Sequence, residues 1–323
     1  MDEGNPVPTS MGVGDLVVDD PPPAFEVTPD VPPVFVDEPT FVPDTTDEPE
    51  TLPTAAEPEP VELDELPKII AIANQKGGVG KTTTSVNLGA ALAELGFRVL
   101  VVDLDPQGNA STGLGINIRN LSSSIYDVLM TEKPMDDCVE PTSLRNLFVA
   151  PATIDLAGAE IELVPMFSRE LRLRKALHAA RDDYDYIIID CPPSLGLLTV
   201  NAMAAADDVI VPIQCEYYAL EGLGQLMKNV ELVQGNLNEA LHIRGIVLTM
   251  FDARTKLAEQ VEQEVRQFFG SRVYRTIVPR TVRLSEAPSF GQPITVFDPT
   301  SRGAIAYREL AKEVSRGATR RAG

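Results

Sequence analysis

The sequence predicts an α/β protein with a doubly wound, mostly parallel sheet and helices on both faces, preceded by a disordered tail. From residue 68 onward, short apolar strands alternate with helical segments, which is typical of a parallel sheet covered on both sides. A glycine-rich loop separates the first strand from the first helix. The composition also changes abruptly near residue 67. We therefore predict two parts, a tail over residues 1–66 and one domain over residues 67–323.

The tail is acidic and rich in proline. Residues 1–67 contain 18 acidic residues, no Lys or Arg, and 15 of the 27 prolines of the chain. Such a segment cannot bury enough apolar surface to fold. The remaining residues hold 30 acidic and 27 basic side chains, so most of the net charge of −21 belongs to the tail. Within residues 22–43 a Pro-Pro-x-Phe pattern recurs, which indicates either low-complexity drift or a docking motif for a polar scaffold protein.

Several classes of protein are excluded. No stretch approaches the roughly 20 apolar residues of a membrane-spanning helix, and no signal peptide follows Met1. The three cysteines, Cys138, Cys191 and Cys215, lie far apart, which argues against a disulfide framework or a zinc site. We expect a soluble protein of a reducing, cytoplasmic compartment, with Cys191 as a small buried residue.

The predicted elements follow in order along the chain. Runs of apolar and β-branched residues predict strands at 68–73, 98–103, 186–190, 208–213, 243–250 and 273–278. Apolar residues at helical spacing predict helices at 82–95, 168–181, 220–234, 257–269 and 303–316. Gly96 closes the first of these helices.

The strongest chemical signal is the loop Lys76-Gly77-Gly78-Val79-Gly80-Lys81-Thr82-Thr83. A strict P-loop pattern requires glycine where this chain has Gln75, but the chemistry of the loop is retained. Its glycines allow backbone amides to curl around phosphate oxygens, and the following helix points its positive end at them. Lys81 can reach the β- and γ-phosphates, and the Thr82 hydroxyl can ligate Mg²⁺. The sequence therefore predicts an ATP site with magnesium.

Motifs beyond the loop carry a resemblance to a known family. They are Val101-Val102-Asp103-Leu104-Asp105-Pro106-Gln107, Ile188-Ile189-Asp190-Cys191-Pro192-Pro193, Cys215-Glu216-Tyr217-Tyr218-Ala219-Leu220-Glu221-Gly222 and Val282-Arg283-Leu284-Ser285-Glu286-Ala287-Pro288-Ser289. With the lysine that opens the loop, they resemble the deviant Walker A ATPases, and within these the ParA/Soj partitioning proteins. The resemblance covers roughly residues 68–316 and implies a chromosome- or plasmid-partitioning ATPase.

The resemblance also implies roles for single residues. Lys76 would cross a dimer interface and touch the phosphates bound by the other subunit. Asp105 would orient the attacking water or accept its proton, and Asp103 would support it from within the strand. Asp190 would hold Mg²⁺ through water. Adenine would lie near Met250 and Pro279.

Partners follow from the same resemblance. ATP would close a sandwich homodimer that binds double-stranded DNA without sequence specificity, and a ParB-like protein would stimulate hydrolysis and release the dimer. Arg254, Arg280 and Arg283 are the candidate contacts to DNA phosphates. Such a protein would be associated with the nucleoid.

Two alternatives remain open. One is a membrane-associated positioning ATPase resembling MinD, although the C-terminal residues lack a bulky apolar face. The other is a regulatory scaffold that acts through its acidic tail.

Overall fold

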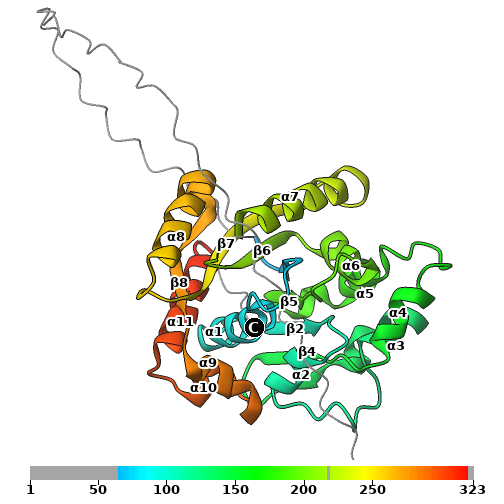
Figure 1. The fold of residues 1–323 in the computed structure, drawn as a ribbon. Coiled ribbons are helices and arrows are strands. Elements are labelled where there is room, and N and C mark those ends of the chain that lie inside the picture. The colour runs from blue at the N-terminus through cyan, green and yellow to red at the C-terminus, as the bar shows by residue number, and fades with distance from the viewer. Residues whose placement is uncertain (1–64, 217–218, 319–323) are drawn as a thin grey trace, which may run out of the picture. The chain divides into compact units, whose positions relative to one another are not determined.

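The computed structural model describes residues 65–216 and 219–318, so the repeats at 22–43 and most of the predicted tail lie outside the described residues. One eight-stranded sheet has the order β3-β4-β2-β5-β1-β6-β7-β8 (Figure 1). Its strands are parallel except for the antiparallel pair β3 and β4. The strands are β1 (Lys68–Ile72), β2 (Val99–Asp103), β3 (Glu140–Pro141), β4 (Leu147–Ala150), β5 (Tyr186–Asp190), β6 (Asp208–Gln214), β7 (His242–Phe251) and β8 (Val273–Pro279).

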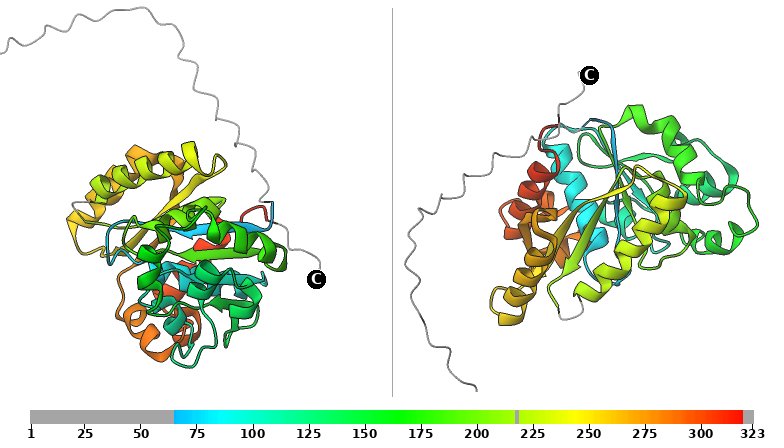
Figure 2. Two further views of the ribbon diagram at one scale, coloured as in Figure 1. Left: turned by 90° about the vertical axis from the view of Figure 1, so that its right-hand side faces the viewer. Right: turned by 90° about the horizontal axis from the view of Figure 1, so that it is seen from above.

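Helices cover both faces of the sheet (Figure 2). They are α1 (Lys81–Glu94), α2 (Asn109–Gly113), α3 (Ile125–Thr131), α4 (Leu156–Glu162), α5 (Arg172–Ala180), α6 (Leu197–Ala205), α7 (Ala219–Asn236), α8 (Lys256–Phe269), α9 (Val282–Glu286), α10 (Ile294–Phe297) and α11 (Arg302–Val314). Side chains of α1 and α11 pack in one core cluster, and those of α5 to α8 pack in the other. Alternate residues of β1 enter the two clusters, as expected of a strand buried on both sides. The predicted fold class is confirmed.

The six predicted strands are all present, but several elements were not predicted. These are β3 and β4, the helices α2, α3, α4, α6, α9 and α10, and short 3₁₀ turns that include Ala287–Phe290. The helix predicted over 168–181 begins only at Arg172. Ser168 has a φ of 50°, a left-handed conformation that does not continue into a helix.

The register of the sheet positions the chemistry. Asp190, the last residue of β5, lies opposite Ile72 of β1 on one side and Asp103 of β2 on the other. The three strands therefore end in one row, directly beneath the loop that joins β1 to α1. Carboxyl ends of parallel strands are where open α/β sheets bind ligands.

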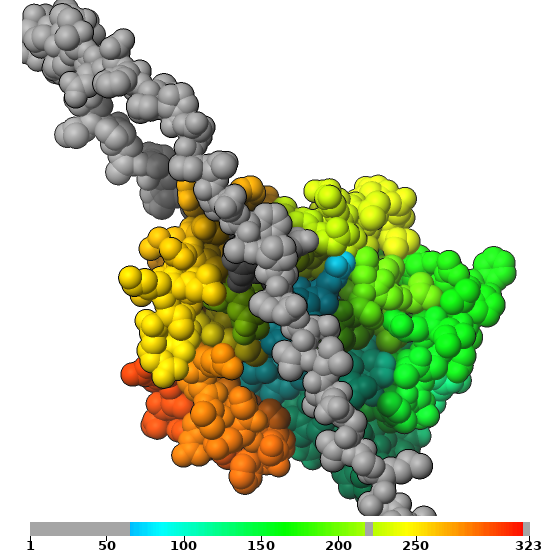
Figure 3. All heavy atoms as spheres, viewed as in Figure 1, coloured from blue at the N-terminus to red at the C-terminus, as the bar shows by residue number. Residues whose placement is uncertain are grey.

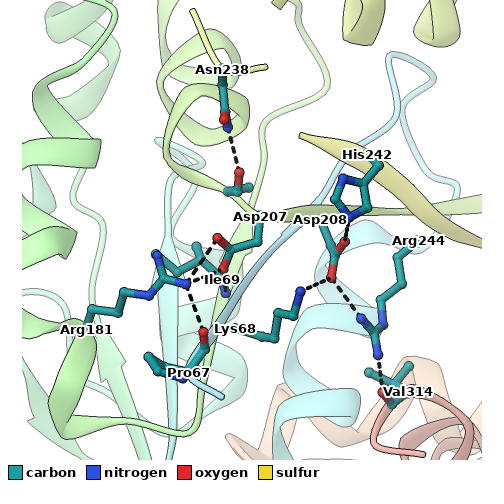
Figure 4. A network of polar contacts seen from close by, with 11 residues as sticks. Pro67, Lys68, Ile69, Arg181, Asp207, Asp208, Asn238, His242, Arg244 and Val314 are labelled. Atoms are coloured by element: carbon teal, nitrogen blue, oxygen red, sulfur yellow. Dashed lines mark hydrogen bonds and ion pairs between the residues drawn. The ribbon is translucent and has the colours of Figure 1, made fainter. Parts of the chain in front are cut away.

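At the other edge of the sheet, a network of ion pairs links the amino ends of β1, β6 and β7 (Figure 4). Asp208 begins β6 and is almost fully buried, and its carboxylate accepts a hydrogen bond of 2.8 Å from Arg244 Nη1. The ammonium of Lys68 lies 3.7 Å from the same carboxylate. Arg244 also donates to the carbonyl of Val314 at the end of α11. One carboxylate thus joins β1, β6, β7 and the last helix.

We expect Asp208→Ala to destabilise the domain by about 3–5 kcal/mol, because it leaves two largely buried cations without this carboxylate. Urea denaturation measures the effect. Glu309→Ala is the matched control, since the ion pair of Glu309 with Lys312 is exposed and should contribute no more than about 1 kcal/mol. Equal denaturation midpoints for the two variants would contradict the structural role of Asp208.

Candidate active site

The loop between β1 and α1 forms a cradle at the carboxyl edge of the sheet. Gly78 and Gly80 have φ values of 74° and 87°, which favour glycine. Nothing lies within 4 Å of the position that a Cβ atom of Gly78 would occupy. No side chain caps the first turn of α1, so its free N–H groups and its positive end face the cradle. This combination fits phosphate groups.

A cavity of about 270 Å³ adjoins the loop, and most of the predicted site residues line it. They are Gly77, Gly78, Gly80, Lys81, Thr82, Thr83, Asp105 and Met250. The ammonium of Lys81 donates to the carbonyl of Lys76 at 3.1 Å. Burial lowers the pKa of Lys81, and the carboxylate of Asp190 partly offsets that effect. The cavity therefore has a cation at the position that phosphate binding requires.

The predicted magnesium residues lie next to each other. Thr82 and Ser85 of α1 both favour the ionised form of the Asp190 carboxylate, and Ser85 Oγ donates to Asp190 Oδ1 at 2.8 Å. Asp190 Oδ2 is buried and has no hydrogen-bond partner. Burial, and next the neighbouring Asp103 carboxylate, raise the pKa of Asp190 to about 8. A hard cation would favour the ionised form of this carboxylate, so the residues present fit Mg²⁺.

Asp103 and Asp105 have different surroundings. Asp103 is fully buried, and its Oδ2 accepts hydrogen bonds from the Ser111 amide at 2.8 Å and the Ser111 hydroxyl at 2.6 Å. Burial raises the pKa of Asp103 to about 6. Asp105 lines the cavity, and its Oδ1 accepts from the Gln107 amide at 3.0 Å. Asp103 therefore anchors α2, while Asp105 faces the space where a substrate would bind.

Four residues predicted for the site do not line this cavity, and one of them is the fully buried Asp190 described above. Lys76 turns to Glu216, and its ammonium lies 2.9 Å from Glu216 Oε2. Val79 is buried, and its carbonyl accepts from Thr249 Oγ1 at 2.8 Å. Pro279 ends β8 opposite Phe251. Of the two residues expected near adenine, only Met250 borders the cavity.

Three residues of the site were given no role from the sequence, although Pro193 and Asn109 stand in segments that match the family pattern. Asn109 and Pro193 line the cavity, and Ser85 bonds to Asp190. Pro193 follows the β5 carboxylate by three residues, and Ser85 lies one helical turn after Lys81, so their positions relative to the motifs were the available signals.

The cysteines take no part in this chemistry. Cys191 is fully buried, as predicted, and burial raises the pKa of its thiol. The other two cysteines, Cys138 and Cys215, are also buried and unbonded. In the parts of the chain that the structure describes, no group of three or more His, Cys, Asp or Glu residues could hold a metal ion.

Two of the candidate DNA-contact arginines lie on adjacent loops, and the third, Arg283, lies in α9. Arg254 follows β7, Arg280 follows β8, and the Arg280 amide donates to the Phe251 carbonyl at 2.9 Å. The Arg254 guanidinium forms two hydrogen bonds with Asp252, which hold the pKa of that carboxyl at about 2. Arg283 pairs with Glu286 at 3.1 Å and with Asp298 at 3.4 Å. The sequence from 272 to 283 contains no acid, but the fold brings Asp298 to Arg283, while Asp252 and Glu286 pair with Arg254 and Arg283 from nearby in the sequence.

Comparisons with known proteins agree with this geometry. A family model described as an AAA domain matches residues 67–243. The chain is 62% identical over 248 residues to the sporulation initiation inhibitor protein Soj of Bacillus subtilis, covering 77% of this chain and 98% of that protein. It is 57% identical to the chromosome partitioning protein ParA of Myxococcus xanthus, covering 76% of this chain and 87% of that protein.

Solved structures with the same fold carry nucleotides. A Mycobacterium smegmatis structure described as cobyrinic acid a,c-diamide synthase with ADP and magnesium has a TM-score of 0.69 at 41% identity. It is matched over 78% of this chain and 95% of its own. The septum site-determining protein MinD of Pyrococcus horikoshii with Mg-ADP has a TM-score of 0.63 at 27% identity, over 77% of this chain and 96% of its own.

Proposed function

Because the chain belongs to the ParA/Soj family of chromosome-partitioning ATPases, we propose that ATP closes two copies of it into a sandwich dimer that binds DNA without sequence specificity. A ParB-like protein bound to a centromere-like site stimulates hydrolysis and so releases the dimer from DNA. The partitioning names come from relatives at 52–57% identity, whereas the synthase name comes from a structure at 41%. The observation that carries the proposal is the arrangement of two lysines around the cradle. Lys81 lies in the cavity with Thr82, above the buried Asp190, whereas the ammonium of Lys76 lies outside the cavity beside Glu216.

ATP binds in the cradle with its phosphates on the amides of the loop. Gly77, Gly78 and Gly80 leave room for the phosphate oxygens, and Lys81 neutralises their charge. Thr82 would ligate Mg²⁺ and Asp190 would hold it through water, and the bound metal would offset negative charge on the transferred phosphoryl group. Asp105 orients the attacking water or accepts its proton, since it lines the cavity.

Two surfaces support the sandwich dimer. The first is Lys76, whose ammonium lies outside the cavity of its own subunit. The second is the segment from Ile154 to Phe167, which includes α4 and is named here the apolar stripe, where Ile154, Ile161 and Phe167 are 67%, 77% and 97% exposed. This stripe belongs to the green segment at the rim of the face in Figure 3. Apolar side chains gathered in this way mark surfaces that a partner covers.

The apolar stripe is connected to the nucleotide cavity. Glu160 of α4 packs against Gly196 so closely that a Cβ atom there would lie 1.9 Å from Glu160 Oε1. Gly196 follows Pro193, which lines the cavity, by three residues. α4 therefore packs against the segment that follows the cavity-lining Pro193.

The membrane alternative has less support. Among the described residues, no helix has the length and apolarity needed to cross a membrane. The apolar side of α11 packs against α1, so this helix does not offer a free amphipathic face.

We propose a cytoplasmic location on the nucleoid. Residues 1–66 would form a tail outside the ATPase domain, with residues 22–43 available to a polar scaffold protein.

We expect Arg283→Glu or Arg254→Glu to weaken DNA binding by the ATP-bound dimer at least about tenfold, because each dimer loses two phosphate contacts. The slope of log affinity against log salt should become shallower by about 2. Fluorescence anisotropy with two unrelated DNA duplexes measures both quantities. Arg174→Glu, which reverses an exposed arginine of α5, should leave both unchanged. Equal losses for Arg174→Glu and Arg283→Glu would contradict a localised DNA surface.

A further inference from the structure

The ammonium of Lys76 is held away from its own nucleotide cavity by one carboxylate. Glu216 Oε2 accepts from Lys76 Nζ at 2.9 Å, across 140 residues of sequence. Both side chains are partly exposed, at 37% and 47%. The contact therefore lies at the surface, where the ammonium remains accessible to a second molecule.

Glu216 is itself held in place. Its Oε1 accepts from Gln214 Nε2 at 2.6 Å, and its backbone amide donates to the Gln214 carbonyl at 2.8 Å. Gln214 is the last residue of β6, the strand beside β1. The Lys76 backbone is fixed from the same strand, because Asn74 accepts from the Lys76 amide and donates to the Pro212 carbonyl. The backbone and the ammonium of Lys76 are thus both positioned by contacts that lead back to β6.

A lysine at this position needs such support. Its side chain has four rotatable bonds, and fixing them costs up to about 2 kcal/mol of conformational entropy. Glycine follows it at positions 77 and 78, so the backbone beyond it adds little restraint. An ammonium has three N–H donors, so it can keep Glu216 as a partner and still donate to a phosphate oxygen.

We propose that Glu216 is a positioning residue for Lys76, which it directs out of its own cavity toward the phosphates bound by a second copy. This inference rests on the proposed sandwich dimer. Glu216 does not line the nucleotide cavity of its own subunit, and it acts only by reducing the freedom of the lysine before the subunits meet.

The test uses the full chain with magnesium and a non-hydrolysable ATP analogue, and follows dimerisation by sedimentation velocity. Glu216→Gln keeps the shape of the side chain and removes its charge. We expect the dimer dissociation constant to rise about threefold to fivefold, the range of a partly exposed ion pair. Binding of the analogue to the monomer should be unchanged. Glu309→Gln, which removes the carboxylate of an exposed ion pair on α11, is the matched control and should dimerise like the wild type.

A double variant separates positioning from a general structural effect. If Glu216 acts only through Lys76, the combination Lys76→Ala with Glu216→Gln should dimerise as weakly as Lys76→Ala alone. Additive losses would overturn the proposal, as would unchanged or tighter dimerisation of Glu216→Gln. Wild-type chain that stays monomeric with the analogue would overturn the proposed dimer itself, so the two failures are distinct.

Discussion

Replacement of Asp105 by alanine is expected to reduce ATP hydrolysis by about 10²–10⁴-fold, the usual contribution of a positioned general base. ATP binding should persist, because Lys81, Thr82 and the loop glycines are untouched. Dimer that cannot hydrolyse ATP should accumulate on DNA. Phosphate release measures the rate, and co-sedimentation with DNA measures the accumulation.

The control for this variant is Asp252→Ala, which removes an acid outside the cavity and should hydrolyse ATP at the wild-type rate. A loss of fold would also reduce hydrolysis, so the melting temperature of each variant is compared with that of the wild type. A stable Asp105→Ala protein with normal turnover would place the catalytic carboxylate elsewhere.

Replacement of Lys76 by alanine is expected to separate ATP binding from dimerisation. The monomer should bind ATP normally, because the Lys76 side chain lies outside the cavity. The dimer dissociation constant should rise at least about 30-fold, since loss of one partner from a buried charge pair costs about 2 kcal/mol or more. Light scattering with ATP, and DNA binding under the same conditions, measure the two losses together.

Lys81→Ala is the matched control within the same loop. Because Lys81 lines the cavity, its loss should abolish ATP binding itself, and dimerisation should fail as a consequence. A Lys76→Ala protein that dimerises with wild-type affinity would remove the proposed role of this lysine across the interface.

The central strands were predictable because each is an apolar run buried on both faces. β1, β2 and β5 needed only local sequence, and the motifs that follow them identified the cradle. The missed elements give weak local signals. α6 is apolar on nearly every side, so its sequence shows no helical periodicity, and β3 has only two residues, one of them Pro141.

The contacts between distant residues could not be read from the sequence. Glu216 belongs to a motif that was recognised, yet nothing in the sequence pairs it with Lys76. The arginine-rich stretch from residue 272 to 283 contains no acid, but the fold brings Asp298 to Arg283. Such partners depend on which loops meet at the carboxyl edge of the sheet, and only the packed structure determines that.

The central claim is that the bound nucleotide controls assembly and DNA binding together. Sedimentation velocity of the wild-type chain with a fluorescent DNA duplex tests it, with magnesium and either ADP or a non-hydrolysable ATP analogue. The account predicts a monomer free of DNA with ADP, and a dimer that sediments with DNA when the analogue is present. Equal DNA binding by a monomer in both nucleotide states would contradict it.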